Sequence, residues 1–197
     1  MLLPVLTHKG NLNLINASRA IEISNHHVQR MDEIVEILDH TVFTYEIIFV
    51  DDCSVDETRA LIKKTAARYP HVPIRHLFHT RNVGRGGTVA DGFRLARGKI
   101  MGYIDIDLEV HARYIPSCVV AIQNGADIAT AMRVYKFHLP SLDRYFASKG
   151  YKWLMQKLLK VDLQDTETGY KFFNRDKFLP ILDEVQDKGW FWDTESM

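Results

Sequence analysis

The chain has 197 residues, of which 46% are hydrophobic and 25% are charged, so it can bury one sizeable core and we expect a single domain. Lysine plus arginine and aspartate plus glutamate each number 25, which leaves no formal net charge. No bulk electrostatic field therefore favours nucleic acid as a partner, and partners have to be inferred from local sites.

Cysteine usage and the apolar runs indicate the compartment. Cys53 and Cys118 are the two cysteines, far apart and without the spacing of metal ligands, which is typical of a reducing compartment. The first residues reach Thr7 and His8 without the apolar core of a signal peptide. Charged residues interrupt the longest apolar runs, so none is predicted to span a bilayer. We expect a cytoplasmic protein.

Predicted strands and helices alternate along the chain. Short apolar runs predict strands, and apolar residues at helical spacing predict helices. In chain order, strands are predicted at residues 45–51, 73–79, 99–105 and 127–134, and helices at 56–69, 87–97, 112–124 and 142–160. Repeated strand-helix units predict an α/β fold with a mostly parallel sheet and helices on both faces.

Acidic residues follow the two most apolar predicted strands. Asp51 and Asp52 follow EIIFV, and Asp105 follows IMGYI. Carboxyl ends of parallel strands share one edge of the sheet, where α/β proteins bind ligands, so these acids are expected to gather there. Alternate residues of an extended segment face the same way, so Asp105, Asp107 and Glu109 can point together at a hard cation. The alternative is that they only solvate a turn or cap a helix.

Three motifs resemble, in order, the nucleotide-binding, glycine-rich and metal-binding motifs of family 2 glycosyltransferases with the GT-A fold. They are FVDDCSVDET (49–58), TRNVGRGGTVADGFRLARGK (80–99) and DIDLE (105–109). DTETGYKFFNR (165–175) and GWFWDTE (189–195) are similar to later motifs of the polyprenyl-phosphate sugar transferase branch, which includes dolichyl-phosphate mannose synthases. The resemblance implies a Rossmann-like GT-A fold and inverting transfer of a sugar from a nucleoside diphosphate.

The resemblance assigns a donor site to the first half of the chain. Asp51 and Asp52 can accept hydrogen bonds from the nucleoside, because ionised carboxylates are acceptors. Glycines that open a helix after a strand either expose backbone N–H groups to an anion or permit a tight turn. The nucleotide-binding residues that the resemblance implies are Pro4, Asp51, Asp52, Arg81, Asn82, Gly84, Arg85, Gly86 and Asp105. We expect Ser54 and Asp56 to form a turn and cap the next helix instead.

The implied metal ligands are Asp107 and Glu109, with Asp105 as a contact to the donor sugar, the ribose or a metal-bound water. Mg²⁺ or Mn²⁺ held there would bridge to the diphosphate and neutralise the charge of the leaving group. Glu109 stands where the branch often has glutamine, which adds charge and keeps an oxygen ligand.

A phosphate acceptor needs cations of its own. The residues expected to contact it are Arg133, Arg144, Ser148, Lys171 and Arg175. Arg144 and Ser148 are one helical turn apart, although arginines on helices are more often solvated surface. An acceptor phosphate is already ionised, whereas a hydroxyl acceptor needs a general base. Asp165 and Asp193 are the candidates for that base, and Asp105 completes the predicted catalytic group.

The start of the chain departs from the family pattern. In MLLPVLTHKGN, Pro4 matches the family's P-x-Y-N-E stretch, but Leu6, Thr7 and His8 replace the tyrosine, asparagine and acid. This places a shortened first strand near Pro4 and leaves residues 16–39 as a long connection to the next strand.

The chain stops at Met197, just after the D-x-E motif, so we expect a shortened single domain over residues 1–197. Its nucleotide-binding half is expected at residues 1–110 and its acceptor half at residues 111–197. Sheet edges exposed by the shortening favour a homo-oligomer. Trp190, Phe191 and Trp192 either line a lipid or sugar site or pack in the core.

The leading hypothesis is a metal-dependent enzyme that transfers a sugar from a UDP- or GDP-sugar to polyprenyl phosphate at the cytoplasmic face of a membrane. One alternative keeps the donor and changes the acceptor to a hydroxyl of a saccharide, protein or small molecule. The other is a catalytically silent nucleotide-binding protein, because the N-terminal motif is replaced.

Overall fold

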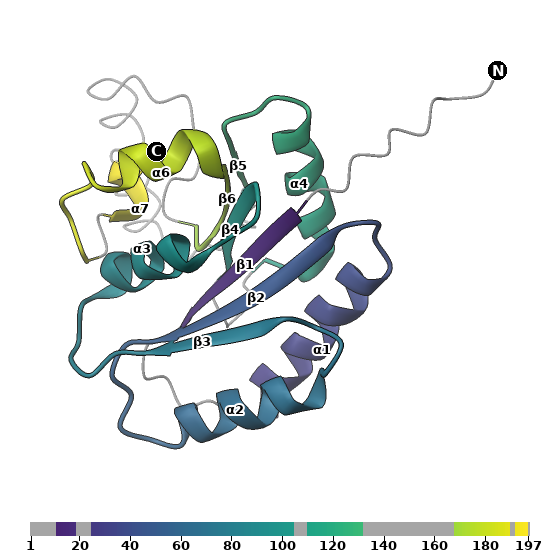
Figure 1. Cartoon of the computed structure of the whole chain (residues 1–197), viewed down its shortest axis with the longest axis vertical. Helices are drawn as coiled ribbons and strands as arrows, with labels where there is room; N and C mark the ends of the chain where they lie inside the picture. Colours follow the sequence, from purple (N-terminus) through teal and green to yellow (C-terminus); the bar gives the residue numbers. More distant parts are fainter. Residues whose placement is uncertain (1–10, 19–24, 105–109, 132–167, 190–191, 197) are drawn as a thin grey trace, which may run out of the picture.

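A computed structural model of the chain describes residues 11–18, 25–104, 110–131, 168–189 and 192–196 (Figure 1). In chain order its elements are β1 (Asn11–Ser18), α1 (Asn25–Asp39), β2 (Thr44–Asp51), α2 (Thr58–Arg68), β3 (Ile74–Phe78), α3 (Arg85–Leu95), β4 (Ile100–Ile104), the 3-10 helix η1 (Ala112–Tyr114), α4 (Ile115–Gln123), β5 (Ile128–Thr130), β6 (Tyr170–Asn174), α6 (Arg175–Leu182) and α7 (Trp192–Glu195). The predicted helix at 142–160 lies outside the described residues.

The described strands form one mixed sheet in the order β3-β2-β1-β4-β6-β5. β3, β2, β1 and β4 are parallel, so Asp51 at the end of β2 lies beside Ser18 and Phe78, the last residues of β1 and β3. We call this side of the sheet the carboxyl edge. β6 is antiparallel to β4 and β5, and it therefore begins at the carboxyl edge, with Tyr170 beside Ile104. The prediction of a mostly parallel sheet is confirmed.

Helices cover both faces of the sheet (Figure 1). On one face α1, α2 and α4 bury residues such as Leu38 against Ile47 and Phe49 of β2. On the other face α3, α6 and α7 bury residues such as Phe93 against Ile48 and Val50. Neighbouring residues of β2 thus enter opposite cores, which is why its sequence is a continuous apolar run. Fully burying each such side chain contributes about 1.5 to 3 kcal/mol.

The first described strand, β1, was not predicted. β1 comprises Asn11–Ser18, and α1 occupies Asn25–Asp39, within the stretch that the sequence suggested was a connection. The segment NLNLINAS alternates polar and apolar residues on either side of the pair Leu14–Ile15, a pattern compatible with a strand. In the fold it is a central strand that pairs with both β2 and β4. Pro4 lies outside the described residues.

Candidate functional site

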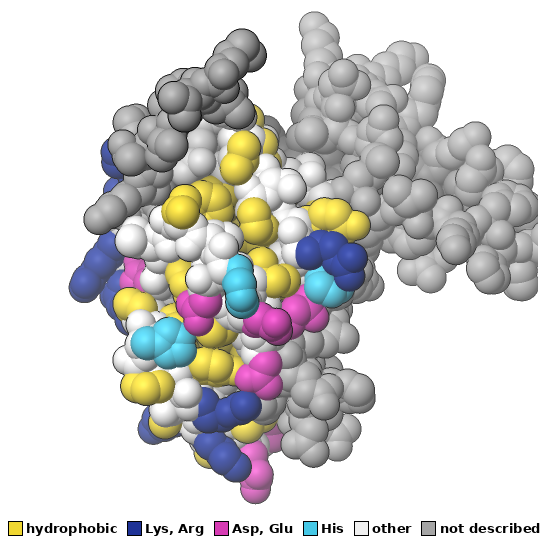
Figure 2. Space-filling model, turned by 90° about the vertical axis from the view of Figure 1, so that its right-hand side faces the viewer, with side chains coloured by type: hydrophobic (Ala, Val, Ile, Leu, Met, Phe, Trp, Pro, Cys, Tyr) yellow, Lys and Arg dark blue, Asp and Glu magenta, His cyan; other side chains and the backbone are white. Residues whose placement is uncertain are grey.

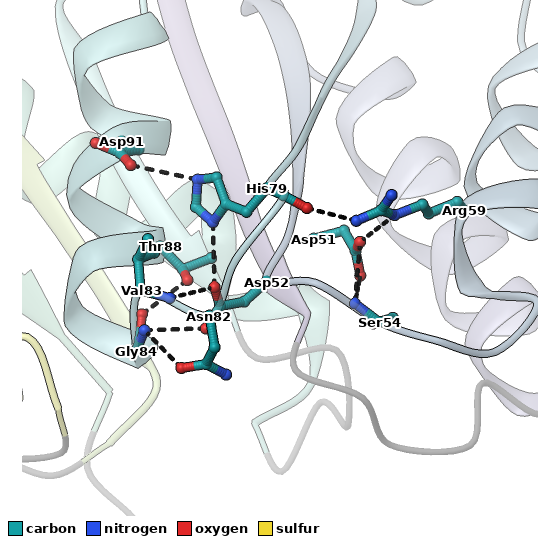
Figure 3. Close-up of polar contacts among 10 residues, drawn as sticks. All are labelled: Asp51, Asp52, Ser54, Arg59, His79, Asn82, Val83, Gly84, Thr88 and Asp91. Carbon is teal, nitrogen blue, oxygen red and sulfur yellow. Dashed lines mark hydrogen bonds and ion pairs between the residues drawn. The ribbon is translucent and has the colours of Figure 1, made fainter.

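Asp51 ties the end of β2 to the two elements that follow it. Its carboxylate is fully buried, lies 2.8 Å from Nε of Arg59 on α2, and accepts a hydrogen bond from the backbone N–H of Ser54 (Figure 3). Arg59 also donates to the backbone carbonyl of His79, just beyond β3. The expected turn is confirmed at Asp56, which accepts from the Thr58 N–H at 2.9 Å. The expected cap is not confirmed, because Glu57 is the N-cap residue of α2 and makes no side-chain cap hydrogen bond.

Asp52 holds the loop between β3 and α3. Its two carboxylate oxygens accept hydrogen bonds from the N–H groups of Val83 at 2.8 Å and Gly84 at 3.0 Å (Figure 3). Nδ1 of His79 lies 3.2 Å from the same carboxylate. The other ring nitrogen of His79 lies 3.3 Å from Asp91 Oδ2 on α3, in an ion pair without hydrogen-bond geometry. The carboxylate therefore faces the backbone of the glycine-rich motif.

The glycines at the start of α3 permit a tight turn and a close approach. Gly84 has a φ of +84°, which favours glycine, and a side chain there would strike the carbonyl oxygen of Lys188. A Cβ on Gly86 would lie 2.5 Å from the Trp192 side chain. The N–H groups of Gly86 and Gly87 donate to the Lys188 carbonyl at 2.9 and 3.3 Å. Of the two interpretations of these glycines, this geometry matches the tight turn.

A buried ion cluster joins α3, α7 and the sheet. Asp193 on α7 lies 2.9 Å from Nε of Arg85 and 3.2 Å from Nζ of Lys171. The hydroxyl of Tyr103 on β4 donates to the same carboxylate, and Lys171 also donates to the backbone carbonyl of Asp193. The side chains of Lys171, Asp193 and Arg85 are 0%, 4% and 13% exposed. Removing one partner of such a buried pair leaves an uncompensated charge.

The structure brings many of the predicted site residues to the carboxyl edge. They are Asp51, Asp52, Asn82, Gly84, Arg85, Gly86, Lys171 and Asp193. Arg81 is exposed in the loop before α3. The following predicted site residues lie outside the described part of the chain: Pro4, Asp105, Asp107, Glu109, Arg133, Arg144, Ser148 and Asp165.

Two expected acceptor contacts are not where a phosphate would reach them. Lys171 is fully buried, and its ammonium group binds Asp193. Arg175 follows the end of β6, which lies beside the start of β4 and so on the side of the sheet opposite the carboxyl edge. Its guanidinium donates to the carbonyl of Ala96 at 3.2 Å. We therefore leave Lys171 and Arg175 out of the acceptor site proposed below.

Sequence reasoning missed the residues that hold the edge together. His79 and Tyr103 were counted as parts of strands, and Arg59 as part of a helix. For Trp192, the structure bears out packing, since the residue is 2% exposed and its ring lies 5.7 Å from that of Tyr103. The contacts of Trp192 and Asp193 with the start of α3 join residues about a hundred positions apart, so the sequence carries no local signal of them.

Charge on the described surface is mixed. Figure 2 shows acidic, basic and histidine side chains interspersed on one face. Among the described residues, no group of three or more His, Cys, Asp or Glu side chains is arranged to hold a metal ion. The expected metal ligands Asp107 and Glu109 follow β4 in the sequence and lie outside that part. None of the helices described is long and apolar enough to cross a membrane.

The chain is similar to curated glycosyltransferases. It is 33% identical to glycosyltransferase AglD of Haloferax volcanii over 156 residues, which is 78% of this chain and 25% of the relative. It is 33% identical to the dolichol-phosphate mannosyltransferase of Pyrococcus furiosus over 55% of this chain and 30% of that one. It is 28% identical to the dolichyl-phosphate beta-glucosyltransferase of Dictyostelium discoideum over 78% of this chain and 50% of the relative. The chain thus spans between a quarter and half of these proteins.

Solved structures share the fold. The mannosyltransferase PcManGT of Pyrobaculum calidifontis, in complex with GDP-Man and Mn²⁺, superposes with a TM-score of 0.62 at 14% identity, over 89% of this chain and 47% of that one. Glucosyl-3-phosphoglycerate synthase of Mycobacterium tuberculosis, in complex with Mn²⁺ and UDP-glucose, gives 0.61 at 16% identity, over 86% and 57%. These likenesses confirm the expected GT-A fold. The family model described as Glycosyl transferase family 2 matches residues 27–181, and the chain belongs to that family.

Proposed function

We propose that the chain contributes to a glycosyltransferase that moves a sugar from a nucleoside-diphosphate donor to polyprenyl phosphate. The observation that carries this proposal is the carboxyl edge, where the acids after β2 and the glycine-rich start of α3 meet in a family 2 chain. The polyprenyl acceptor is supported by relatives named as dolichol-phosphate and dolichyl-phosphate sugar transferases. The cytoplasmic face of a membrane is where such a lipid phosphate would be reached.

The donor would bind across the carboxyl edge, beside the loop held by Asp52. Ligands of α/β sheets bind beyond the carboxyl ends of the strands, and here the loop after β3 carries the exposed Arg81. Asp51, expected to contact the nucleoside, is fully buried against Arg59 and is left out of the donor contacts. Arg85, the first residue of α3, adds a guanidinium at the positive end of the helix dipole. We propose that Arg81 and Arg85 together contact the nucleoside diphosphate, without assigning either to the base, the ribose or the diphosphate. UDP and GDP are both to be tested.

Asp107 and Glu109 would hold Mg²⁺ or Mn²⁺, because charged oxygen ligands suit a hard cation. Such an ion supplies neutralisation of the diphosphate as it leaves. Two solved structures with this fold contain Mn²⁺ together with a nucleotide sugar, which supports a divalent cation here.

Arg133, Arg144 and Ser148 would bind the acceptor phosphate, which needs charge-assisted hydrogen bonds and little help from a general base. The hydroxyl-acceptor alternative would instead depend on Asp165 as the base. A homo-oligomer remains a proposal, to be tested by the mass of the protein in solution.

Protection of a cysteine tests the donor proposal without measuring turnover. Cys53 directly follows Asp52 and is half-buried, so a nucleotide at the carboxyl edge should shield it from alkylation. We expect UDP or GDP with Mn²⁺ to slow iodoacetamide labelling of Cys53 at least about threefold and the nucleotide alone to slow it less. Asp107→Asn should remove the Mn²⁺ effect, because one charged ligand is worth about tenfold or more in affinity.

The exposed Asp127, which pairs with Lys177, offers a matched control in Asp127→Asn. This variant should leave the protection intact. Equal labelling rates with and without both nucleotides and metal would contradict the proposed donor site, and a metal effect that survives Asp107→Asn would contradict the ligand assignment.

A further inference from the structure

The carboxylate of Asp193 is engaged by three donors from other elements. Arg85 approaches one oxygen, and Lys171 and Tyr103 approach the other. Two of these donors are cations, which stabilise the ionised carboxylate. A general base needs an oxygen that faces the acceptor hydroxyl, and Asp193 is 3% exposed. The geometry is that of a fixed anchor, which differs from the catalytic role that the sequence suggested for Asp193.

We propose that Asp193 is a positioning residue of the donor site, acting through Arg85. In this assignment Lys171 and Tyr103 hold the carboxylate of Asp193 in place. The carboxylate in turn fixes the orientation of the guanidinium of Arg85, the first residue of α3. The inference rests on the proposed function and deepens it, because it names the residue that orients a donor contact and removes Asp193 from the list of candidate bases.

Arg85 is held on more than one side. Its Nε donates to Asp193 at 2.9 Å, and its guanidinium carbon lies 5.8 Å from the centroid of the Tyr103 ring. The guanidinium is planar, so fixing one edge and one face leaves few orientations for the rest of the group. Binding is tighter when a contact is oriented in advance, because less conformational entropy is lost when the ligand arrives.

The described residues 186–189 and 192–196, which we call the C-terminal clamp, fix the helix start that carries Arg85. The Lys188 carbonyl accepts from the Gly86 and Gly87 N–H groups, and the Trp192 side chain packs where Gly86 has no Cβ. The ion pair from Asp193 to Arg85 is the third connection between the clamp and α3. Backbone, packing and charge therefore join the same two pieces of chain.

The second acid of the D-x-E motif folds the clamp itself. Glu195 accepts from the N–H groups of Gln186 and Asp187, and Asp187 accepts from those of Gly189 and Trp192. These contacts join the two described parts of the clamp, the second of which carries Asp193. Of the two acids of the motif, Glu195 therefore binds within the clamp and Asp193 binds Arg85 of α3.

A double-mutant cycle tests the assignment by measuring nucleotide affinity with Mn²⁺. We expect Arg85→Gln and Asp193→Asn each to weaken UDP or GDP binding about tenfold, and the double variant to be no more than about twofold weaker than Arg85→Gln. Asp193→Asn should also leave the pH profile of kcat unchanged. Multiplicative losses, or an unchanged affinity with a lost limb of the pH profile, would overturn the assignment. Asp183→Asn, which removes an exposed carboxylate paired with Arg94, is the control.

Amide hydrogen exchange tests whether Asp193 stabilises the start of α3, independently of whether a nucleotide binds. Asp193→Asn should speed exchange over residues 84–88 at least about tenfold while Asp183→Asn does not, and unchanged exchange would overturn the anchor. Lys171→Met/Asp193→Asn removes both members of the buried pair and should show the same faster exchange if the single variant fails to fold. If the native protein binds neither UDP nor GDP, the proposed function is wrong. The exchange experiment still shows in that case whether Asp193 stabilises the start of α3.

Discussion

The carbonyl oxygen of Lys188 lies 2.9 Å from the amide nitrogen of Gly86 and accepts its hydrogen bond. This contact joins the stretch that follows α6 to the first turn of α3. It explains the glycines at positions 84 and 86, because the Lys188 carbonyl and the Trp192 side chain occupy the space that a Cβ would need. The sequence had also allowed a second interpretation of these glycines, as a site for the diphosphate.

Gly86→Ala should destabilise the fold. The added Cβ would lie 2.5 Å from the Trp192 side chain, which is fully buried and cannot move away. Overpacking of this kind costs about 1 to 3 kcal/mol, more than the gain of up to about 1 kcal/mol from replacing glycine in a helix. Chemical denaturation measures the change in the free energy of unfolding. Gly87→Ala is the matched control, because its Cβ would meet the Val83 side chain at 3.3 Å and the Lys188 Cβ at the ordinary contact distance of 3.9 Å.

Asp52→Asn should loosen the loop before α3. The amide has one acceptor oxygen, so its NH₂ group would face the N–H of either Val83 or Gly84. Leaving a buried donor unsatisfied costs about 1 to 3 kcal/mol in the free energy of unfolding. Nucleotide affinity should fall with it, by about tenfold. Asp91→Asn serves for comparison, since Asp91 is a partly exposed partner of His79 and its loss should cost at most about 1 kcal/mol.

Stability should fall with pH above about 9 because of Cys118. Burial raises the pKa of this thiol from 9.0 to about 11, so between these values the unfolded chain loses the proton and the folded chain keeps it. The stability contribution is complete below pH 9 and is lost as the pH rises to 11, a change of about 2 to 3 kcal/mol at 1.36 kcal/mol per unit. Denaturation from pH 8 to 10 should show the first part of this loss, and Cys118→Ala should flatten the curve over that range. Above pH 10 the tyrosines Tyr45, Tyr69 and Tyr170, whose pKa values are also raised, add a loss that the variant keeps. A slope that is identical in the variant would rule out this cause.

Arg144→Ala should separate transfer from donor hydrolysis. If Arg144 binds the acceptor phosphate, transfer to a polyprenyl phosphate should fall about tenfold or more while nucleotide affinity and slow donor hydrolysis stay nearly unchanged, because a charge-assisted bond contributes about 1.5 to 3 kcal/mol. Arg144→Lys should restore part of the activity, since an ammonium cannot form a bidentate contact. Equal loss of both activities would assign Arg144 to the donor or the fold. A hydroxyl acceptor would show instead as a large loss in Asp165→Asn.

Local pattern in the sequence determined the layers of the fold and the position of the first acids. The run EIIFV predicts a strand with both faces buried, and the structure places Ile48 and Phe49 in opposite cores. Because parallel strands share their carboxyl ends, Asp51 and Asp52 were expected at the ligand edge before any contact was known, and that is where they lie. The strand NLNLINAS was missed although its polar and apolar residues partly alternate, and its place at the centre of the sheet follows from pairing with β2 and β4, which the sequence does not display.

Tertiary structure alone decided what the charged side chains bind. Lys171 was expected to meet a phosphate, yet its strand enters the sheet antiparallel to β4 and turns the ammonium group toward Asp193. The glycines of α3 were compatible with a free helix end until the Lys188 carbonyl was seen to occupy it. Strand and helix patterns arise from neighbours in the chain, which a sequence displays. A buried charge finds its partner across the fold, and nothing local in the sequence marks that partner.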